Sequence, residues 1–400
     1  MYLSKFHLAI LFYLTSIVCS IFGFFSNFFI IITLLITFFI YLIKKLTLNL
    51  YDPMAVDKFI SLSLISLFFY MLAVYQTPVN DVSSFVNVEY MSIVAKYLFG
   101  PSVLFITTKF FWEDNKNQRI FLIMLIIVNV LLILSQILTG VKTGPVLGVL
   151  HSNQMGAIAA CSIGIVCIFK CYGSKHRFIG RVLIACAIIC LSLSLSRGTF
   201  IALISSFLTY GILTRFSNNI KFIVTGIVFL LSLNVYISTD FNRILDSEIG
   251  SVFASTLEET SGKDVLENGR IKIWNTAITS IVKSPYVGIG LYARRSWDRE
   301  LSDGRVHTLS IHNYYLAVLL EAGILGLLSI LFLITGLLLI LHKYKTKVAT
   351  ASTAFLVGVF IHQMTEVSLT TGSLMVGFLI WFTLGIGIKL SLKNKMLLNS

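Results

Sequence analysis

Long apolar stretches recur along almost the whole chain, from Phe6 to Leu392, and short polar segments separate them. A helix needs about 17–25 predominantly apolar residues to cross a hydrocarbon core that is about 30 Å thick. The pattern therefore predicts about twelve transmembrane helices. Their expected ranges are 6–24, 27–43, 59–76, 91–111, 120–138, 152–170, 178–195, 199–214, 221–238, 313–341, 348–365 and 373–390.

The composition is typical of an integral membrane protein. Only 12% of the 400 residues are charged, whereas soluble domains carry roughly 25%. A water-soluble globule of this length is therefore excluded, and the expected fold class is an all-α polytopic membrane protein. The net charge of +13 would suggest a nucleic-acid partner if the basic residues did not have another explanation.

That explanation is membrane topology. Nineteen of the 31 basic residues lie in loops on one side of the predicted spans. The short loops on the other side contain only Lys142 and Arg197 as basic residues, together with the acids Asp81, Glu89 and Glu366. The positive-inside rule then places both termini in the cytoplasm, and a nucleic-acid partner is no longer needed to explain the charge.

One outward segment is much longer than the others. It runs from about residue 239 to 311, between the ninth and tenth spans, and mixes nine basic with ten acidic residues. Apolar residues recur at helical spacing between Gly269 and Pro285, which predicts an amphipathic helix on the outer membrane surface. The expected organisation is spans 1–9 in residues 1–238, a partly helical periplasmic loop in 239–312, and spans 10–12 with a cytoplasmic tail in 313–400.

Two arginines on the outer side are candidates for binding an anion. Arg197 lies in a tight turn between two spans, on the side where the positive-inside rule disfavours a cation. Arg270 opens the amphipathic helix of the loop, where free N–H groups already favour anions. A guanidinium pairs well with phosphate oxygens. The simpler alternatives are contact with lipid headgroups for Arg197 and ordinary surface exposure for Arg270.

His312 stands directly before the tenth span and is a candidate general base. A lone interfacial histidine is more often a satisfied polar residue, and the same caution applies to His151, His307 and His362. Glu321 follows nine residues after His312, about two and a half helical turns away, so helix packing or loop tethering is its preferred role.

Two further observations complete the set of candidates. Lys96 lies within the fourth span, where it could reach the interface, pair with an acid or line the path of an anionic substrate; the first two roles are preferred. The sequence shows no His, Cys and acid cluster at metal-ligand spacing. It therefore predicts chemistry without a metal ion or other cofactor.

Several short motifs occur together and in order. They are Leu-Ser-Arg-Gly at 195–198, Gly-Arg-Ile-Lys-Ile-Trp at 269–274, Ser-Pro-Tyr-Val-Gly-Ile-Gly at 284–290, and His-Asn-Tyr-Tyr-Leu with Glu-Ala-Gly-Ile-Leu-Gly within 312–326. The chain resembles the O-antigen ligase and polymerase superfamily in these motifs, most strongly from about 190 to 330. The segment His151–Gln154 is similar to a short His/Pro-Asn motif that opens an earlier span in many members.

The resemblance implies an inverting glycosyltransferase at the periplasmic face of a bacterial inner membrane. Its donor would be a glycan on undecaprenyl diphosphate. Arg197 and Arg270 would bind the diphosphate, and His312 would activate the acceptor hydroxyl. Supporting roles would fall to Asn313, Asn153, His151 and Glu321.

The resemblance leaves two acceptors open. A ligase transfers the glycan to lipid A-core, whereas a polymerase extends a lipid-linked repeat unit; the length and the single large outer loop favour the ligase. A transporter or flippase is the main alternative class, but such proteins concentrate ionisable groups near the midplane, where these spans have few. A structural scaffold ranks last, because it explains neither the arginines nor the histidine.

Overall fold

The computed structural model describes residues 99–108, 115–139, 152–194, 196–214, 274–275, 277–289, 311–366 and 374–399. Every regular element within these ranges is helical, as the sequence predicts for an all-α protein. The spans predicted at 6–24, 27–43, 59–76 and 221–238 lie outside the described residues, and so does the total of twelve. Of the span predicted at 91–111, the helix Phe99–Thr108 is described.

Seven labelled helices follow the remaining predicted spans closely. They are α5 (Asn115–Thr139), α6 (Ser152–Tyr172), α7 (Arg177–Ser194), α8 (Arg197–Leu213), α13 (Tyr314–Tyr344), α14 (Lys347–His362) and α15 (Leu374–Asn399). Among the described residues, five helices are long and apolar enough to cross a membrane, namely α5, α6, α7, α13 and α15. The helix α15 continues well past the predicted end at 390, because Leu392 and the residues after it keep helical hydrogen bonding.

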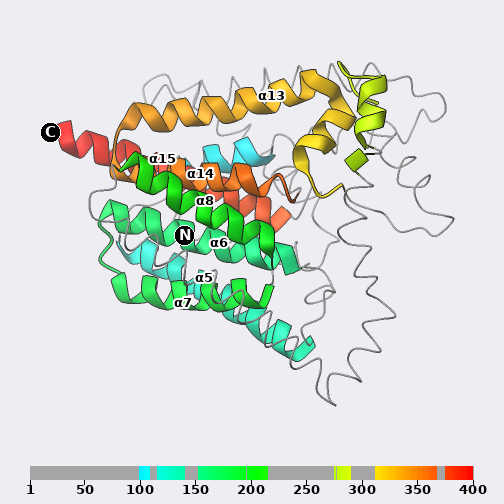
Figure 1. Ribbon diagram of the computed structural model, residues 1–400. Helices are drawn as coiled ribbons and strands as arrows, with labels where there is room; N and C mark the ends of the chain where they lie inside the picture. Colours follow the sequence, from blue (N-terminus) through cyan, green and yellow to red (C-terminus); the bar gives the residue numbers. More distant parts are fainter. Residues whose placement is uncertain are drawn as a thin grey trace, which may run out of the picture.

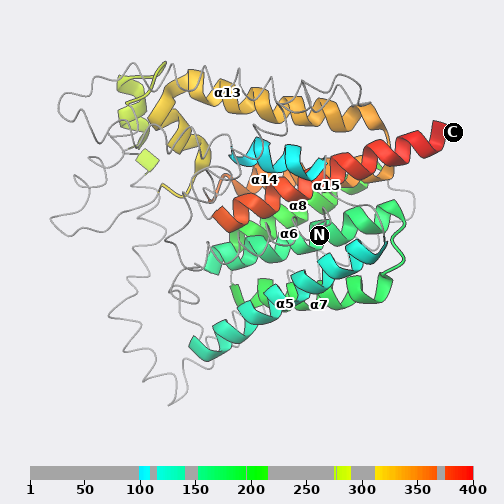
Figure 2. The same ribbon diagram turned by 180° about the vertical axis from the view of Figure 1, so that it is seen from behind.

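The helices lie side by side in layers. In Figures 1 and 2, α13 covers one side, α14, α15 and α8 form the middle, and α6 separates them from α5 and α7 on the opposite side. The helix α14 packs most extensively on α8. Buried Phe105, Phe169 and Phe378 belong to the core between the layers.

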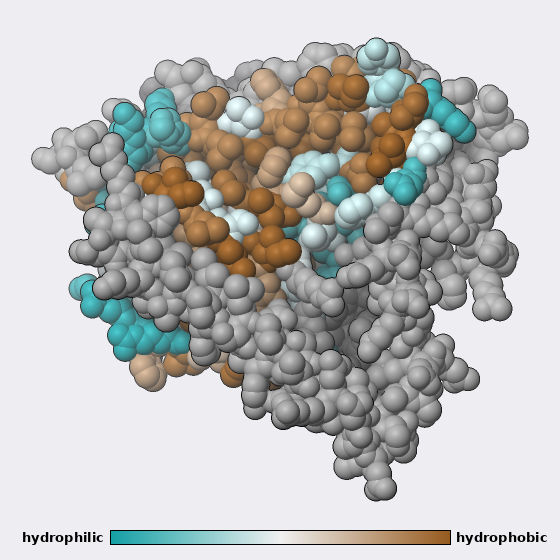
Figure 3. Space-filling view, in the orientation of Figure 1, coloured by the Kyte–Doolittle hydropathy of each residue, from teal (hydrophilic) through white to brown (hydrophobic). Residues whose placement is uncertain are grey.

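Large apolar side chains also cover the outside of the bundle. Leu131 of α5 and Leu328 and Leu339 of α13 are more than half exposed. In Figure 3, which has the orientation of Figure 1, hydrophobic residues lie across the middle of the visible face and hydrophilic ones lie toward its two ends. An apolar surface of this extent is typical of a protein that faces lipid.

Alternation of helix direction gives the two ends of the bundle different chemistry. The starts of α6, α8 and α13 meet the end of α14 at one end, where Glu321 and Glu366 are the only acids in the described ranges. The opposite end carries several lysines of the helix connections, which include Lys170, Lys345 and Lys347. We refer to these as the Glu366 end and the basic end.

The helix α13 is bent near the Glu366 end, where the sequence predicts one continuous span. Gly323 has φ +61° and ψ −160°, which interrupts the helix. The amide of Ile324 donates to the carbonyl of Pro285 at 2.8 Å instead of to its own helix. The segment after the bend, 324–344, is about 31 Å long and is sufficient to cross the hydrocarbon core.

The bend is a docking site for the turn that follows the loop helix. Besides Pro285, the carbonyl of Tyr286 accepts from Leu325 at 3.2 Å, and the amide of Ile289 donates to Leu320 at 2.8 Å. Gly288 in this turn also has a positive φ, of +71°, and its Cα lies against the backbone of Glu321 and Ala322. Two sequence motifs that are more than thirty residues apart therefore form one backbone joint.

The joint predicts an unequal response to two alanine substitutions. Gly323→Ala imposes a left-handed backbone on alanine and drives its Cβ into the backbone of Tyr286 and Val287. Gly173→Ala also places alanine at a positive φ, of +93°, but an added Cβ there meets open space. Thermal unfolding of the purified protein should show a larger loss of stability for Gly323→Ala. Equal losses in the two variants would contradict a tight joint.

Candidate functional site

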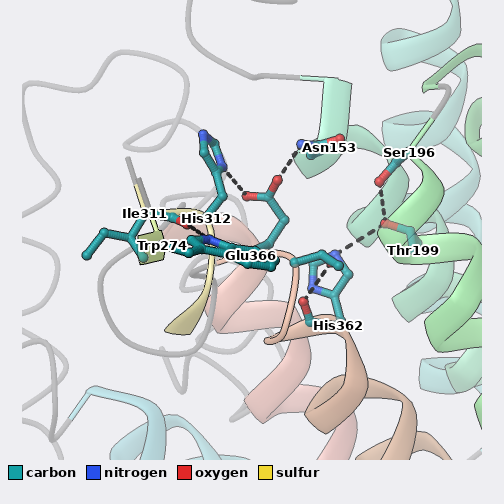
Figure 4. A network of polar contacts seen from close by, with 9 residues as sticks. Asn153, Ser196, Thr199, Trp274, Ile311, His312, His362 and Glu366 are labelled. Atoms are coloured by element: carbon teal, nitrogen blue, oxygen red, sulfur yellow. Dashed lines mark hydrogen bonds and ion pairs between the residues drawn. The ribbon is translucent and has the colours of Figure 1, made fainter. Parts of the chain in front are cut away.

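A carboxylate at the Glu366 end joins three separate helices (Figure 4). Glu366 follows the end of α14, and its amide still donates to His362 at 3.0 Å. One carboxylate oxygen accepts a hydrogen bond from the side-chain amide of Asn153, in the first turn of α6. The other oxygen lies 3.4 Å from Nδ1 of His312, which directly precedes α13. Glu366 is 18% exposed and His312 is 38% exposed, so the histidine is open to a substrate.

The backbone of His312 is held in an unusual conformation. Its φ of +47° is in the left-handed region, which is uncommon for a residue with a side chain. The carbonyl of Ile311 accepts from the indole Nε1 of Trp274 at 2.9 Å, and the amide of Tyr314 donates to Gln363 at 2.9 Å. Contacts on both sides therefore fix the histidine. Strained residues of this kind cluster at functional sites.

Trp274 belongs to a short helical segment of the large loop, which continues through 277–283. Ala277 of this segment is buried against Ile311, Ala317 and Leu320, at the start of α13. The segment predicted to form this helix is helical where the structure describes it, and one of its sides packs on the helix that follows His312. Its position relative to the membrane surface stays a prediction.

The start of α8 lies against the end of α14. Gly198 packs so closely on Thr365 that a Cβ at this position would clash with the threonine side chain. At the next residue, Thr199 Oγ1 lies 3.3 Å from Nε2 of buried His362 and 2.8 Å from Oγ of Ser196 (Figure 4). The backbone of Arg197 is consequently next to the residue that precedes Glu366.

The other predicted site residues have different placements. Asn313 caps α13, since its side-chain oxygen accepts from the amide of Leu316 at 3.1 Å. Glu321 is buried in α13, and its backbone takes part in the contact with Gly288. Arg270, His151 and Lys96 lie outside the described residues, and of Arg197 the structure describes the backbone and not the side chain.

The arrangement around His312 suits proton transfer. A carboxylate accepts hydrogen bonds, so this contact suits an imidazole that carries a proton on Nδ1. In that tautomer Nε2 has the lone pair that a general base needs. Asn153 satisfies the second carboxylate oxygen and fixes its orientation. Within the described ranges, no three His, Cys, Asp or Glu side chains are grouped as a metal site would require.

Glu366 has no site role in the sequence analysis, where it counts only as an acid of an outer loop. The available signal is its position directly after the predicted span 348–365. That span is predicted to end on the outer side of the membrane, where the large loop leads to His312. An acid at this position can therefore lie close to the histidine. The sequence does not show which of the outer loops meet, so the pairing follows only from the structure.

Comparison with known proteins agrees with the resemblance drawn from the motifs. Residues 182–331 match the family model described as O-antigen ligase, a match that covers less than half of the chain. No curated protein matches the sequence. The matched region includes α8, the loop helix, the joint at Gly323 and His312. It confirms the O-antigen ligase superfamily over these residues and supports a multi-pass protein of lipid-linked glycan chemistry in the bacterial inner membrane.

The contact between Trp274 and Ile311 generates a prediction about local stability. Trp274→Phe removes the indole N–H and leaves the carbonyl of Ile311 without that donor, a loss of about 1 kcal/mol. Amide hydrogen exchange in residues 311–320 should accelerate about fivefold, while exchange in α14 and α15 stays unchanged. Tyr286→Phe, which alters an exposed side chain of the same loop segment, serves as the control. Unchanged exchange in Trp274→Phe would contradict the tether.

Proposed function

We propose that the protein is an O-antigen ligase. It transfers a glycan from undecaprenyl diphosphate to lipid A-core at the periplasmic face of the inner membrane. The observation that carries the proposal is the grouping of His312, Glu366 and Asn153 beside the start of α8, where Arg197 stands. This grouping lies at one end of the bundle. His312 and Arg197 belong to the segment that matches the O-antigen ligase family, and Asn153 and Glu366 flank that segment in the sequence.

The charge distribution supports the proposed side of the membrane. The basic end carries several lysines of the helix connections, which the positive-inside rule favours at a cytoplasmic surface. The Glu366 end then faces the periplasm, and both termini face the cytoplasm. A lipid-linked donor reaches such a site from within the membrane.

The proposed reaction is a direct displacement. Nε2 of His312 accepts the proton of the acceptor hydroxyl as its oxygen attacks the anomeric carbon of the donor glycan. The bond between that carbon and the diphosphate oxygen breaks, the anomeric configuration inverts, and undecaprenyl diphosphate leaves. Arg197 and Arg270 neutralise the charge on the departing diphosphate, for which a planar guanidinium is well suited.

Glu366 acts through His312 as a positioning residue. Its carboxylate holds the proton on Nδ1, orients the ring and stabilises the positive charge that the imidazole acquires. Asn153 keeps the carboxylate in place from the side of α6. The strained backbone at His312 and its two flanking hydrogen bonds serve the same purpose, because a base works only within hydrogen-bond reach of the proton.

The proposal predicts that three substitutions stop glycan transfer. His312→Ala removes the base, which typically contributes 10²–10⁴-fold, and Arg197→Ala and Arg270→Ala each remove a diphosphate contact. The measurement is the rate of transfer by purified protein from an undecaprenyl-diphosphate-linked glycan to lipid A-core. Arg181→Ala, which removes an arginine from α7 near the basic end, is the matched control and should retain full activity.

The same assay separates the two acceptors. Product on lipid A-core supports the ligase, whereas lengthened chains on undecaprenyl diphosphate, formed without lipid A-core, would show a polymerase. Full transfer by all three variants at normal protein level would rule out the proposed site for either acceptor.

A further inference from the structure

A cavity that the proposed reaction does not use runs between α6, α8 and α14. Its volume is about 470 Å³, which is within the roughly 300–1,000 Å³ that is typical of small-molecule sites. The lining residues on α6 recur every three or four positions from Ala157 to Cys171, so the cavity extends along about 21 Å of that helix. This is about two thirds of the hydrocarbon thickness of a bilayer.

The walls of the cavity are apolar along most of its length. Small residues of α6 and α14, such as Ala160, Gly164 and Ala354, leave room between the helices, and Leu203 and Phe207 of α8 face them. Walls of this kind do not suit a sugar or a free nucleotide, because they leave polar groups without partners. They suit a hydrocarbon chain that enters from the surrounding lipid.

The basic end of the cavity has a different character. Lys170, at the end of α6, and Lys347, the first residue of α14, both line it, and Tyr210 of α8 stands beside them. The N-terminus of α14 adds the positive end of a helix dipole at the same point. The two acids in the described part of the chain, Glu321 and Glu366, belong to the opposite end. A phosphate group at this mouth is therefore attracted by every described charge near it.

We propose that this cavity is a binding site for an anionic phospholipid of the inner leaflet. One acyl chain lies between α6, α8 and α14, and the phosphate lies between Lys170 and Lys347. Basic pockets between transmembrane helices on the cytoplasmic side are suited to such headgroups. The phosphate position lies at the opposite end of the bundle from His312, and the far end of the cavity reaches Thr199 and His362. The bound lipid supports the contact between α6, which carries Asn153, and α14, which Glu366 follows.

The test measures lipid binding by the full-length protein in detergent. Dissociation constants are determined for phosphatidylglycerol and phosphatidylcholine with identical acyl chains, by native mass spectrometry. We expect phosphatidylglycerol to bind more tightly. Each lysine near an anionic lipid contributes about a fivefold factor, so the double variant Lys170→Gln, Lys347→Gln should weaken phosphatidylglycerol binding about 25-fold and leave phosphatidylcholine unchanged. Both lysines are exposed, so the substitutions do not disturb the core.

A matched control separates this site from diffuse attraction to a basic surface. Lys175→Gln, Lys343→Gln removes two exposed lysines from the same end that do not line the cavity, and it should leave binding unchanged. Equal affinity for the two phospholipids, or equal losses in the two double variants, would overturn the proposal. Tighter binding of undecaprenyl phosphate than of phosphatidylglycerol to the same lysines would overturn the assignment to a phospholipid.

A second variant tests the apolar part of the site without changing its charge. Ala160→Phe places a large side chain in the cavity, where Ala160 is only partly buried. We expect it to weaken binding of both phospholipids at least tenfold, because the acyl chain loses its space. Unchanged binding of phosphatidylglycerol in this variant would show that the chain lies elsewhere, and would contradict the proposed site.

Discussion

The arrangement of the Glu366 end depends on one carboxylate that contacts two other elements. The carboxylate of Glu366 accepts a hydrogen bond from the side-chain amide of Asn153, at the start of α6. Its other oxygen lies 3.4 Å from Nδ1 of His312, which directly precedes α13. A charge at the edge of the hydrocarbon is costly unless partners compensate it. These contacts supply that compensation and bring together three segments that the chain separates by more than fifty residues at the closest. The same contact favours an imidazole of His312 with a proton on Nδ1.

The rest of this end maintains that contact. Trp274 and Gln363 hold the backbone on either side of His312, and the close approach of Gly198 to Thr365 sets the start of α8 beside the end of α14. The joint at Gly323 connects the turn after the loop helix to α13, so the loop cannot shift without moving this helix. The short motifs that resemble the O-antigen ligase family thus have identifiable structural roles in this protein. Some present candidate chemistry, and others hold the backbone that carries it.

The sequence predicts the ranges of the helices well, but it predicts poorly which helices and loops contact one another. The apolar period and the length of each span predict α5 to α8, α13 and α14 within about five residues, because burial in lipid demands continuous helices. The start of α15 is predicted equally well, but its end lies nine residues past the predicted one. The bend at Gly323 escapes prediction, since Ile324 finds its acceptor in Pro285, which is remote in sequence. His312 is proposed from its chemistry and position, and Arg197 from its conflict with the positive-inside rule; both roles stay predictions. Glu366 is not, because its role depends on which loops come together. Asn313, a candidate for a supporting role in the sequence, caps a helix in the structure.

The central claim is that Glu366 and His312 act as one unit in glycan transfer. A double-mutant cycle tests it most directly, with transfer rates for the wild type, Glu366→Gln, His312→Ala and the variant that combines both. If the carboxylate works only through the histidine, Glu366→Gln slows the wild type but has no further effect once His312 is absent, so the combined variant matches His312→Ala. If the two losses multiply, the residues act independently and the account of this site is wrong.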